Sequence, residues 1–268
     1  MDYVIYDDRT QTVLRMTLTT RCPTHGAGRD AYNVHPRNAV ALFGAAWIYP
    51  RMHIVIAIDG PAASGKSSVA RLLARKLGFL YVNSGAMYRA VTWLVTSRGV
   101  AASDVGRVLG LLDSTRFECG AVNLQSTILL DGVDPEPHLT DAAVNANVSA
   151  VSAIAEVRRV LVEKQRVFSE SHDLVMEGRD IGSVVFPETP YKFYVDASLE
   201  VRAARRAKQG LSDAIGERDK VDTTRRNSPL VIAEDAHVIE SSYLTIDGVV
   251  GEIIGRLKLK GLALPAGV

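Results

Sequence analysis

This sequence of 268 residues is poor in cysteine, in net charge and in long apolar runs. Its two cysteines, Cys22 and Cys119, lie far apart, which excludes a disulfide framework and favours a reducing, cytoplasmic location. The 31 basic and 30 acidic residues nearly cancel, so no overall field draws the chain toward nucleic acid or an anionic membrane. The longest strongly apolar run, residues 39–49, is about half of the ~20 residues that span a bilayer. We therefore expect no membrane segment.

The first 51 residues also lack a sustained hydrophobic period, and their apolar run comes too late for a signal peptide. Cys22 and His25 have the spacing of a zinc-ligand pair, but two further ligands at zinc spacing are missing. Met52 stands directly before the first predicted strand. We expect residues 1–51 to lie outside the fold as a disordered or loosely attached extension, or to arise from an upstream start codon that the cell does not use.

What the chain does contain is a phosphate-binding loop between a strand and a helix. Apolar residues 54–58 predict the strand, and residues 69–77 have apolar side chains spaced to line one helix face. The pattern GxxxxGK[ST] lies between them, and with the next residue it comprises Gly60, Pro61, Ala62, Ala63, Ser64, Gly65, Lys66, Ser67 and Ser68. A glycine-rich turn with an incidental lysine is the alternative, but strand, loop and helix together favour nucleotide binding.

Each residue type in this loop has a chemical reason. The two glycines let backbone N–H groups turn toward a polyphosphate without Cβ clashes. The helix start adds partial positive charge, and Lys66 can reach the β- and γ-phosphate oxygens. The Ser67 hydroxyl can bind Mg²⁺. We therefore expect residues 60–68 to bind a nucleoside triphosphate together with Mg²⁺.

The rest of the chain alternates strands with helices. Strands are predicted at residues 54–58, 79–82, 173–176, 192–195 and 237–240. This alternation is typical of an α/β fold in which a five-stranded parallel sheet has helices on both faces. Function belongs at the carboxyl ends of such strands, where the phosphate-binding loop, Ser84 and residues 178–180 all fall.

Between the second and third strands the pattern changes. Residues 104–112 look helical, and residues 115–131 have short β-type runs with an Asp131-Gly132 turn that predict a small antiparallel element. Residues 141–170 again show a helical pattern.

A phosphate-binding loop alone leaves kinases, GTPases, motors and transporter ATPases open. The guanine-binding pattern NKxD is absent, and the most similar segment, residues 219–222, lacks the Asn or Thr at its first position. Arginines instead stand near strand ends and loops: Arg89, Arg158, Arg179, Arg205, Arg218 and Arg225. Phosphoryl transfer between two nucleotides brings together roughly six negative charges, which arginine forks bind bidentately.

Four segments make the chain recognisable: AIDGPAASGKSS, NSGAMYRA, EGRDIGSVVFP and ERDKVDTTRRNSPL. In order and spacing they resemble the bacterial cytidylate kinases, over roughly residues 53–258. The resemblance implies an enzyme that transfers the γ-phosphate of ATP to CMP or dCMP in pyrimidine nucleotide metabolism, giving CDP or dCDP. It implies the nucleoside monophosphate kinase fold and, by precedent, a monomer.

The same resemblance divides the chain into parts. Residues 52–100 and 172–268 would form the core with the phosphate-binding loop. Residues 101–171 would form an enlarged domain that binds the nucleoside monophosphate, and residues 205–228 a short lid. Residues 207–216 are shorter than is usual in the family, which bears on lid closure.

Matched motif by motif, the resemblance also implies roles for single residues in the acceptor site. Ser84 and Arg89 match the residues that hold the CMP phosphate. Ser149 and Arg158 match the pair that faces the cytosine ring, and Asp180 matches a contact to the base. Cytosine presents an N4 donor beside N3 and O2 acceptors, which a carboxylate with arginine and serine donors complements. Uracil would leave buried groups unpaired.

The remaining matches concern the ribose and the reacting phosphates. Asp222 matches the ribose ligand, Arg179 matches a phosphate contact, and Arg218 and Arg225 match lid-side arginines at the reacting phosphates. The implied catalytic residues are therefore Lys66, Arg179, Arg218 and Arg225. Asn83 stands where an acidic residue commonly precedes the SGAMYR motif.

Two other functions remain open at this point. One is a kinase for another acceptor, such as UMP. The other is a nucleotide-dependent RNA-binding protein that uses the basic stretch 202–226. That stretch also contains Asp213, Glu217, Asp219 and Asp222 and lacks aromatic residues for base stacking, so we expect no nucleic-acid partner.

Overall fold

The computed structural model describes residues 2–7, 12–17, 53–208, 215–224, 229–265 and 267. The chain divides into two units, residues 1–50 and residues 51–268. In the first unit, strands β1 (Asp2–Asp7) and β2 (Thr12–Thr17) form an antiparallel pair. Sequence patterns did not predict this hairpin, because residues 8–11 contain none of the Gly or Asn that mark a tight hairpin turn.

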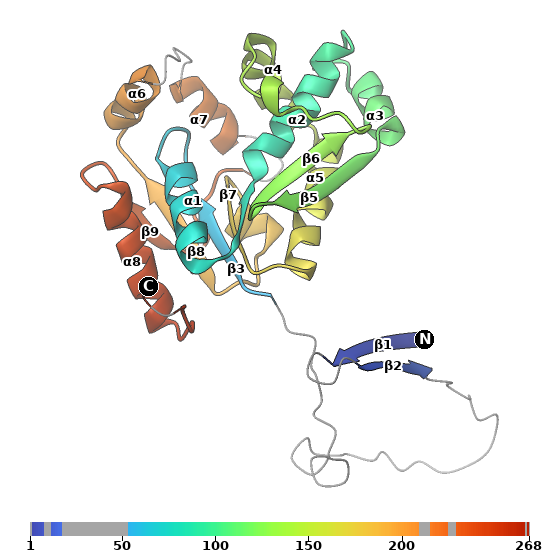
Figure 1. The fold of residues 1–268 in the computed structure, drawn as a ribbon. Helices are drawn as coiled ribbons and strands as arrows, with labels where there is room; N and C mark the ends of the chain where they lie inside the picture. Colours follow the sequence, from blue (N-terminus) through green and yellow to red (C-terminus); the bar gives the residue numbers. More distant parts are fainter. Residues whose placement is uncertain are drawn as a thin grey trace, which may run out of the picture. The chain divides into compact units, whose positions relative to one another are not determined.

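The described residues of the second unit form one seven-stranded sheet in the order β5-β6-β4-β7-β3-β8-β9 (Figure 1). Its parallel strands are β3 (Val55–Asp59), β4 (Leu80–Asn83), β7 (Leu174–Gly178), β8 (Tyr191–Asp196) and β9 (His237–Glu240). Neighbouring pairs among these five are all parallel. The predicted five-stranded parallel sheet is therefore confirmed.

The predicted antiparallel element is also present, as strands β5 (Phe117–Val122) and β6 (Gln125–Leu130). Its tight turn lies at Asn123 and Leu124, which both have positive φ. The Asp131-Gly132 turn follows β6 instead and closes a bridge between Leu130 and Val133. Unexpectedly, β6 pairs with β4, so the hairpin extends the main sheet.

Helices connect these strands. Their bounds are α1 (Lys66–Leu77), α2 (Ser84–Ser97), α3 (Val105–Ser114), α4 (Ala142–Ser152), α5 (Ala155–Val167), α6 (Leu199–Lys208), α7 (Ile215–Thr224) and α8 (Ile246–Leu259). The helical pattern over residues 141–170 is divided, because Ile154 is extended and starts α5 as a separate helix. A turn of 3₁₀ helix, Phe168–Glu170, completes that segment.

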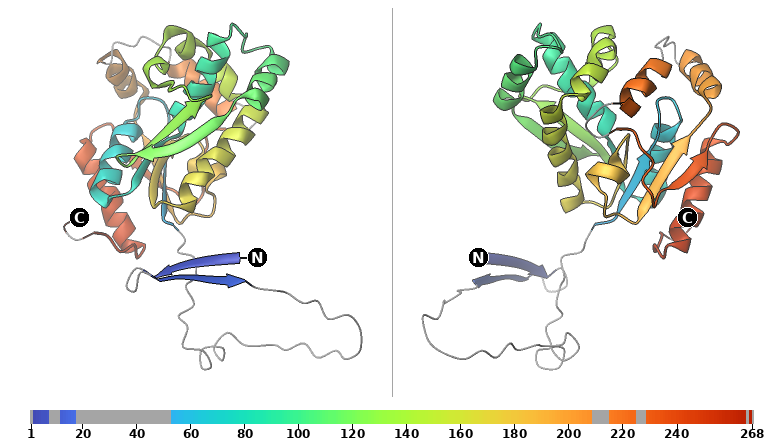
Figure 2. Two further views of the ribbon diagram at one scale, coloured as in Figure 1. Left: turned by 45° about the vertical axis from the view of Figure 1, so that its right-hand side comes forward. Right: turned by 180° about the vertical axis from the view of Figure 1, so that it is seen from behind.

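Two apolar cores sandwich the sheet. Along β3, Val55 and Ala57 belong to one core, and Ile56 and Ile58 belong to the other. The first core includes buried faces of α2, α3, α4 and α5, and the second includes those of α1 and α8. Figure 2 shows the red α8 and the yellow-green α5 on opposite sides of the sheet. Because both faces of the central strands are buried, their sequences are continuous apolar runs, which is why they were predictable.

The helices within the described part of the chain are too short or too polar to cross a bilayer. At the carboxyl ends of the parallel strands, the loop after β3, the start of α2 and the loop after β7 come together, with α6 and α7 alongside (Figure 1). This is the edge of the sheet at which a ligand site is expected in an open α/β fold.

Candidate active site

The phosphate-binding loop depends on its two glycines. Gly60 has φ of +152°, and a Cβ there would lie 2.1 Å from the carbonyl oxygen of Val195 on β8. Gly65 has φ of +98° and stands at the start of α1. Neither position accommodates an L side chain without strain, so the backbone geometry explains why glycine stands at both.

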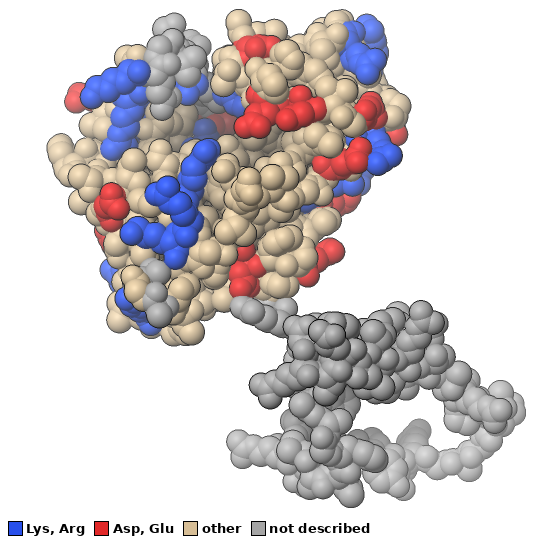
Figure 3. Space-filling model, in the orientation of Figure 1, with Lys and Arg blue, Asp and Glu red and all other residues tan. Residues whose placement is uncertain are grey.

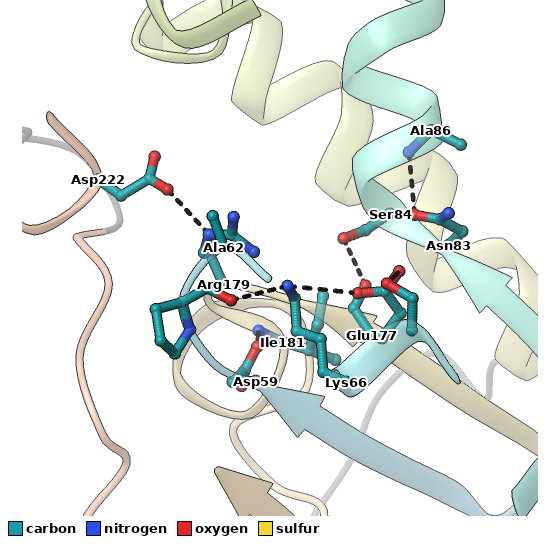
Figure 4. Close-up of polar contacts among 12 residues, drawn as sticks. Asp59, Ala62, Lys66, Asn83, Ser84, Ala86, Glu177, Arg179, Ile181 and Asp222 are labelled. Carbon is teal, nitrogen blue, oxygen red and sulfur yellow. Dashed lines mark hydrogen bonds and ion pairs between the residues drawn. The ribbon is translucent and has the colours of Figure 1, made fainter. Parts of the chain in front are cut away.

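Lys66 and Ser67 both contact Glu177, the fourth residue of β7. The Lys66 Nζ donates to the carbonyl oxygen of Pro61 at 3.1 Å and lies 3.9 Å from Glu177 Oε2 (Figure 4). The Ser67 hydroxyl donates to Glu177 Oε1 at 2.8 Å. Lys66 and Glu177 are both buried. The carboxylate therefore fixes the two side chains of the loop to which nucleotide chemistry was assigned.

Sequence patterns did not single out Glu177, although it lies within the EGRDIG motif. Ile58 on β3 and Glu177 on β7 are register partners, so the end of β7 lies beside the loop that follows β3. The available signal was an acidic residue at the end of an apolar strand. Its partner could not be read from the sequence, because the pairing joins segments more than a hundred residues apart.

A cavity of about 770 Å³ opens beside the phosphate-binding loop. Residues 62–69 line one side of it, and residues 244–246 and Val249 of the β9–α8 region line another. The α6 side contributes three cations: Arg205, Arg206 and Lys208. Figure 3 shows Lys and Arg side chains beside the hollow on its α6 side. A cavity with a phosphate-binding loop and several cations suits a polyphosphate.

Arg205 ties α6 to the loop. Its Nη1 donates to the carbonyl oxygen of Ser64 at 2.9 Å, and its Nη2 donates to that of Ser241 at 2.7 Å. The Ser241 hydroxyl also donates to the Ser64 carbonyl oxygen, at 2.8 Å. Arg202 is buried, forms an ion pair with Asp219 of α7, and donates to the carbonyl oxygen of Ala197 at 2.9 Å. Guanidinium groups thus link α6 to α7 and to the phosphate-binding loop.

A second, smaller cavity of about 90 Å³ adjoins the first. Four residues line both cavities: Gly85, Arg89, Glu177 and Arg179. Arg89 donates to the carbonyl oxygen of Leu139 at 2.7 Å and to Asn145 Oδ1 at 2.8 Å. Because the same residues border both spaces, groups bound in the two cavities would meet at this junction.

The far end of the smaller cavity contains a buried ion pair. Arg158 on α5 pairs with Asp180 in the loop after β7, and both side chains are almost fully buried. The Arg158 guanidinium also lies 5.1 Å from the centre of the Tyr88 ring and donates to the Ser152 carbonyl oxygen at 3.3 Å. Ser149 lines the same cavity. Tyr88 and Ser152 are site residues that sequence patterns did not single out.

Three further contacts order the junction. Arg179 Nε donates to Asp222 of α7 at 2.8 Å (Figure 4). The Ser84 hydroxyl donates to the Glu177 carbonyl oxygen at 2.7 Å. Asn83 caps α2 by accepting from the Ala86 N–H at 3.1 Å, so the residue that departs from the family pattern has a local structural role.

Asp59, the last residue of β3, was not predicted as a site residue either. Its two carboxylate oxygens accept from the backbone N–H groups of Ile181 at 2.8 Å and Gly182 at 2.7 Å. Burial raises the pKa of Asp59 to about 7, and the two backbone hydrogen bonds act in the opposite direction. This carboxylate holds the segment that follows Arg179 and Asp180.

The predicted site residues are therefore gathered at one edge of the sheet, apart from two whose side chains the structure does not describe. Ser84, Arg89, Ser149, Arg158, Arg179, Asp180 and Asp222 all line the smaller cavity. Residues 62–68 line the larger cavity, whereas Gly60 and Pro61 shape the loop behind it. Arg218 is on α7, but its side chain is not among the described ones, and Arg225 lies outside the described residues.

The residues beside the loop suit Mg²⁺. The part of the chain that the structure describes has no group of three or more His, Cys, Asp or Glu side chains placed to hold a metal. The Ser67 hydroxyl and the Glu177 carboxylate nevertheless put hard oxygen atoms side by side. Mg²⁺ typically takes one or two protein oxygens and completes its shell with water and phosphate oxygens. This donor set fits a metal that arrives with a nucleotide.

Comparison with known proteins identifies a family for this chain. The family described as "Cytidylate kinase" matches residues 56–259. A cytidylate kinase of Desulforamulus reducens is 46% identical over 213 residues, covering 75% of this chain and 96% of that protein. One of Clostridium botulinum (strain Loch Maree / Type A3) is 39% identical over 218 residues, covering 77% and 99%. One of Caldanaerobacter subterraneus subsp. tengcongensis is 39% identical over 216 residues, covering 76% and 95%. This chain belongs to the cytidylate kinase family.

Proposed function

We propose that this enzyme transfers the γ-phosphate of ATP to CMP or dCMP, producing ADP with CDP or dCDP. The observation that carries the proposal is the pair of cavities that share Arg89, Glu177 and Arg179. One cavity adjoins the phosphate-binding loop and takes ATP, and the other takes the monophosphate. Membership of the cytidylate kinase family supports the choice of acceptor.

The donor side acts by positioning and charge. Backbone N–H groups of residues 62–68 and the N-terminus of α1 hold the phosphates of ATP. Lys66 moves from the Pro61 carbonyl oxygen to the β- and γ-phosphates, where it balances the charge of the transferring group. Ser67 and Glu177 would hold Mg²⁺, which would neutralise negative charge on the phosphate oxygens.

The acceptor side orients a nucleophile that is already anionic. Ser84 and Arg89 hold the CMP phosphate at the junction of the two cavities. A phosphate oxygen of CMP attacks the γ-phosphorus of ATP, the bond from that phosphorus to the β,γ-bridging oxygen breaks, and ADP leaves. No side chain needs to remove a proton, so placement and charge supply most of the rate. Arg179 is in place to stabilise the charge on the transferring phosphoryl group.

The base is read at the far end of the smaller cavity. Asp180 accepts from N4 of cytosine, while Arg158 and Ser149 donate to N3 and O2. The ion pair between Arg158 and Asp180 fixes both groups before the base arrives. Uracil would place O4 against the Asp180 carboxylate, which would leave this buried carboxylate without a hydrogen-bond donor from the base.

The lid completes the site. Asp222 binds the ribose, and Arg218 and Arg225 reach the reacting phosphates when both nucleotides are present. Support for the first role comes from the position of Asp222 on the wall of the smaller cavity, paired with Arg179. We further propose that the protein acts in the cytoplasm as a monomer without a nucleic-acid partner; a single peak near 29.0 kDa in light scattering would fit the monomer.

The experiment that tests the proposed function is a comparison of acceptors. ADP release from ATP and Mg²⁺ is measured with the purified full chain and CMP, dCMP, UMP, AMP or dTMP. We expect CMP and dCMP to give the highest kcat/KM, with UMP lower by about tenfold or more. A higher value for UMP, AMP or dTMP would assign the enzyme to a different acceptor.

A further inference from the structure

In the loop after β7, a helical turn begins at an aspartate whose side chain does not cap it. Asp180 is the N-cap residue of a short π-helical turn, Ile181–Val185. Asp at an N-cap normally turns its side chain back to accept from the first N–H groups of the helix. Here the Asp180 side chain makes no such hydrogen bond and points to Arg158 instead. Another group must therefore satisfy the N–H groups at the start of this turn.

Asp59 supplies that missing acceptor from a different strand. One of its oxygens accepts from the Ile181 N–H at 2.8 Å, and the other accepts from the Gly182 N–H at 2.7 Å. In Figure 4, Asp59 and Ile181 lie next to each other, beside the Lys66 side chain. Both carboxylate oxygens are committed to the backbone of the turn, and the side chain is buried. Asp59, the last residue of β3, thus caps the N-terminus of this turn.

Packing leaves the turn little room to shift. A Cβ on Gly178 would lie 2.5 Å from the Ser84 hydroxyl oxygen, and a Cβ on Gly182 would lie 3.1 Å from the Lys192 side chain. Lys192 is itself held by Asp235 at 2.8 Å. Neighbouring side chains therefore leave little room for a Cβ at either glycine, and the two hydrogen bonds that Asp59 accepts fix the start of the turn.

We propose that Asp59 is a positioning residue for base recognition: by capping the turn it leaves the Asp180 carboxylate to pair with Arg158 in the acceptor cavity. Without that cap, Asp180 has two competing uses, its own helix N-terminus and the cavity. The Asp180 carboxylate would then accept from the backbone N–H groups of the turn for part of the time, and would be less available to Arg158 and the base. The proposal rests on the proposed function, since it requires that Asp180 contacts the acceptor base.

The test compares three isosteric substitutions in the full chain. Asp59→Asn keeps one acceptor oxygen but presents an amide NH₂ to the second backbone N–H. Asp180→Asn alters the base-reading group itself. Asp173→Asn is the matched control, because the Asp173 carboxylate accepts from the Ile54 N–H at 2.8 Å at the opposite end of the same strands. For each variant, kcat and KM are measured with CMP, UMP and ATP, and Tm is measured by calorimetry.

We expect Asp59→Asn to raise the KM for CMP roughly tenfold and to lower the CMP-to-UMP ratio of kcat/KM by a similar factor, as loss of one buried hydrogen bond predicts. The KM for ATP should change by less than about twofold, because the phosphate-binding loop keeps its own contacts. The double variant Asp59→Asn/Asp180→Asn should show no lower ratio than Asp180→Asn alone, since both act through one carboxylate. Asp173→Asn should lower Tm and leave the ratio unchanged.

An unchanged CMP-to-UMP ratio in Asp59→Asn would overturn the proposal, whatever the loss in Tm. Equal increases in the KM for ATP and for CMP would also overturn it and assign Asp59 to the phosphate-binding loop. If Asp59→Asn does not fold, Asp59→Ser, which is smaller and keeps one acceptor, takes its place with the same outcomes. A wild-type enzyme that does not prefer CMP would refute the proposed function itself, which separates the two failures.

Discussion

The floor and the lid of this active site are built in different ways. We define the floor as residues 59–68 and 177–182, and for this comparison we call helices α6 and α7, which overlap the lid expected at residues 205–228, the lid. Every residue of β3 and β7 is buried, and the floor is held by hydrogen bonds that the Asp59 and Glu177 carboxylates accept. In contrast, no described side chain of α7 is buried, and on α6 only Arg202 is. The floor is fixed by packing, whereas the lid is attached by charge.

The charges that attach the lid also line the site. Arg179 pairs with Asp222 of α7, and Arg205 of α6 donates to the Ser64 carbonyl oxygen of the loop. Both arginines border the larger cavity, where phosphate groups would compete for them. We therefore expect the largest losses of activity from substitutions in the floor, and smaller losses from substitutions in the ion pairs that attach α6 and α7 to it.

The largest expected effect comes from Lys66→Ala in the floor. Loss of the charge that balances the transferring phosphoryl group should lower kcat by ~10²–10⁴-fold with the fold intact. Steady-state kinetics and circular dichroism measure both properties. Lys76→Ala is the matched control, because Lys76 lies exposed in the last turn of the same helix. Near-normal turnover of Lys66→Ala would refute the catalytic assignment of the loop.

Asp180→Asn should have the next largest effect. The amide can rotate to donate toward O4 of uracil, so CMP should lose ~1–3 kcal/mol of binding while discrimination against UMP relaxes. The ratio of the kcat/KM values for CMP and UMP measures this discrimination. If the CMP-to-UMP preference stays unchanged, Asp180 does not read the base, and Arg158 with Ser149 must do so.

A smaller effect is expected in the lid. Asp222→Ala removes the partner of Arg179 and a proposed ribose contact, and should raise the KM for CMP by roughly tenfold with a lesser change in kcat. Tm should change little, since the pair is one contact of a lightly packed helix. Asp222→Asn, which keeps an acceptor oxygen, should fall between this variant and the wild type. A loss of kcat as large as that of Lys66→Ala would show that floor and lid do not differ as described.

The smallest effect should follow deletion of residues 1–51. The family match begins at residue 56, and the site residues all lie beyond Met52. Tm and the KM for CMP of the chain that starts at Met52 should therefore match those of the full chain. An ordered contact with the core would bury apolar area worth about 25 cal/mol per Å². A Tm lower by several degrees, or a raised KM for CMP, would show that this segment belongs to the working enzyme.

The floor was also the part most open to prediction from sequence. The strands of the parallel sheet are apolar runs because both of their faces are buried, and Gly60 and Gly65 stand where the backbone has positive φ. The resemblance to a known family then added Ser149 and Arg158, which no local pattern distinguishes from ordinary helix residues.

Other features depend on neighbours that the sequence does not reveal. Asp59 and Glu177 gain their roles from the pairing of β3 with β7, which lies more than a hundred residues along the chain. Tyr88 joins the site because α5 brings Arg158 over its ring. The division of the 141–170 segment at Ile154 has no Gly or Pro to mark it. Each of these is a tertiary effect rather than a local preference.

The proposed reaction depends most on the meeting of the two cavities at Arg89, Glu177 and Arg179. An analogue that joins adenosine to cytidine through a polyphosphate chain tests this directly, by inhibition kinetics with ATP and CMP varied in turn. If the two cavities form one site, the analogue competes with both substrates and binds more tightly than a matched adenosine–uridine analogue, by about tenfold or more. Competition against only one substrate would contradict it, because the two cavities would then not form a single site.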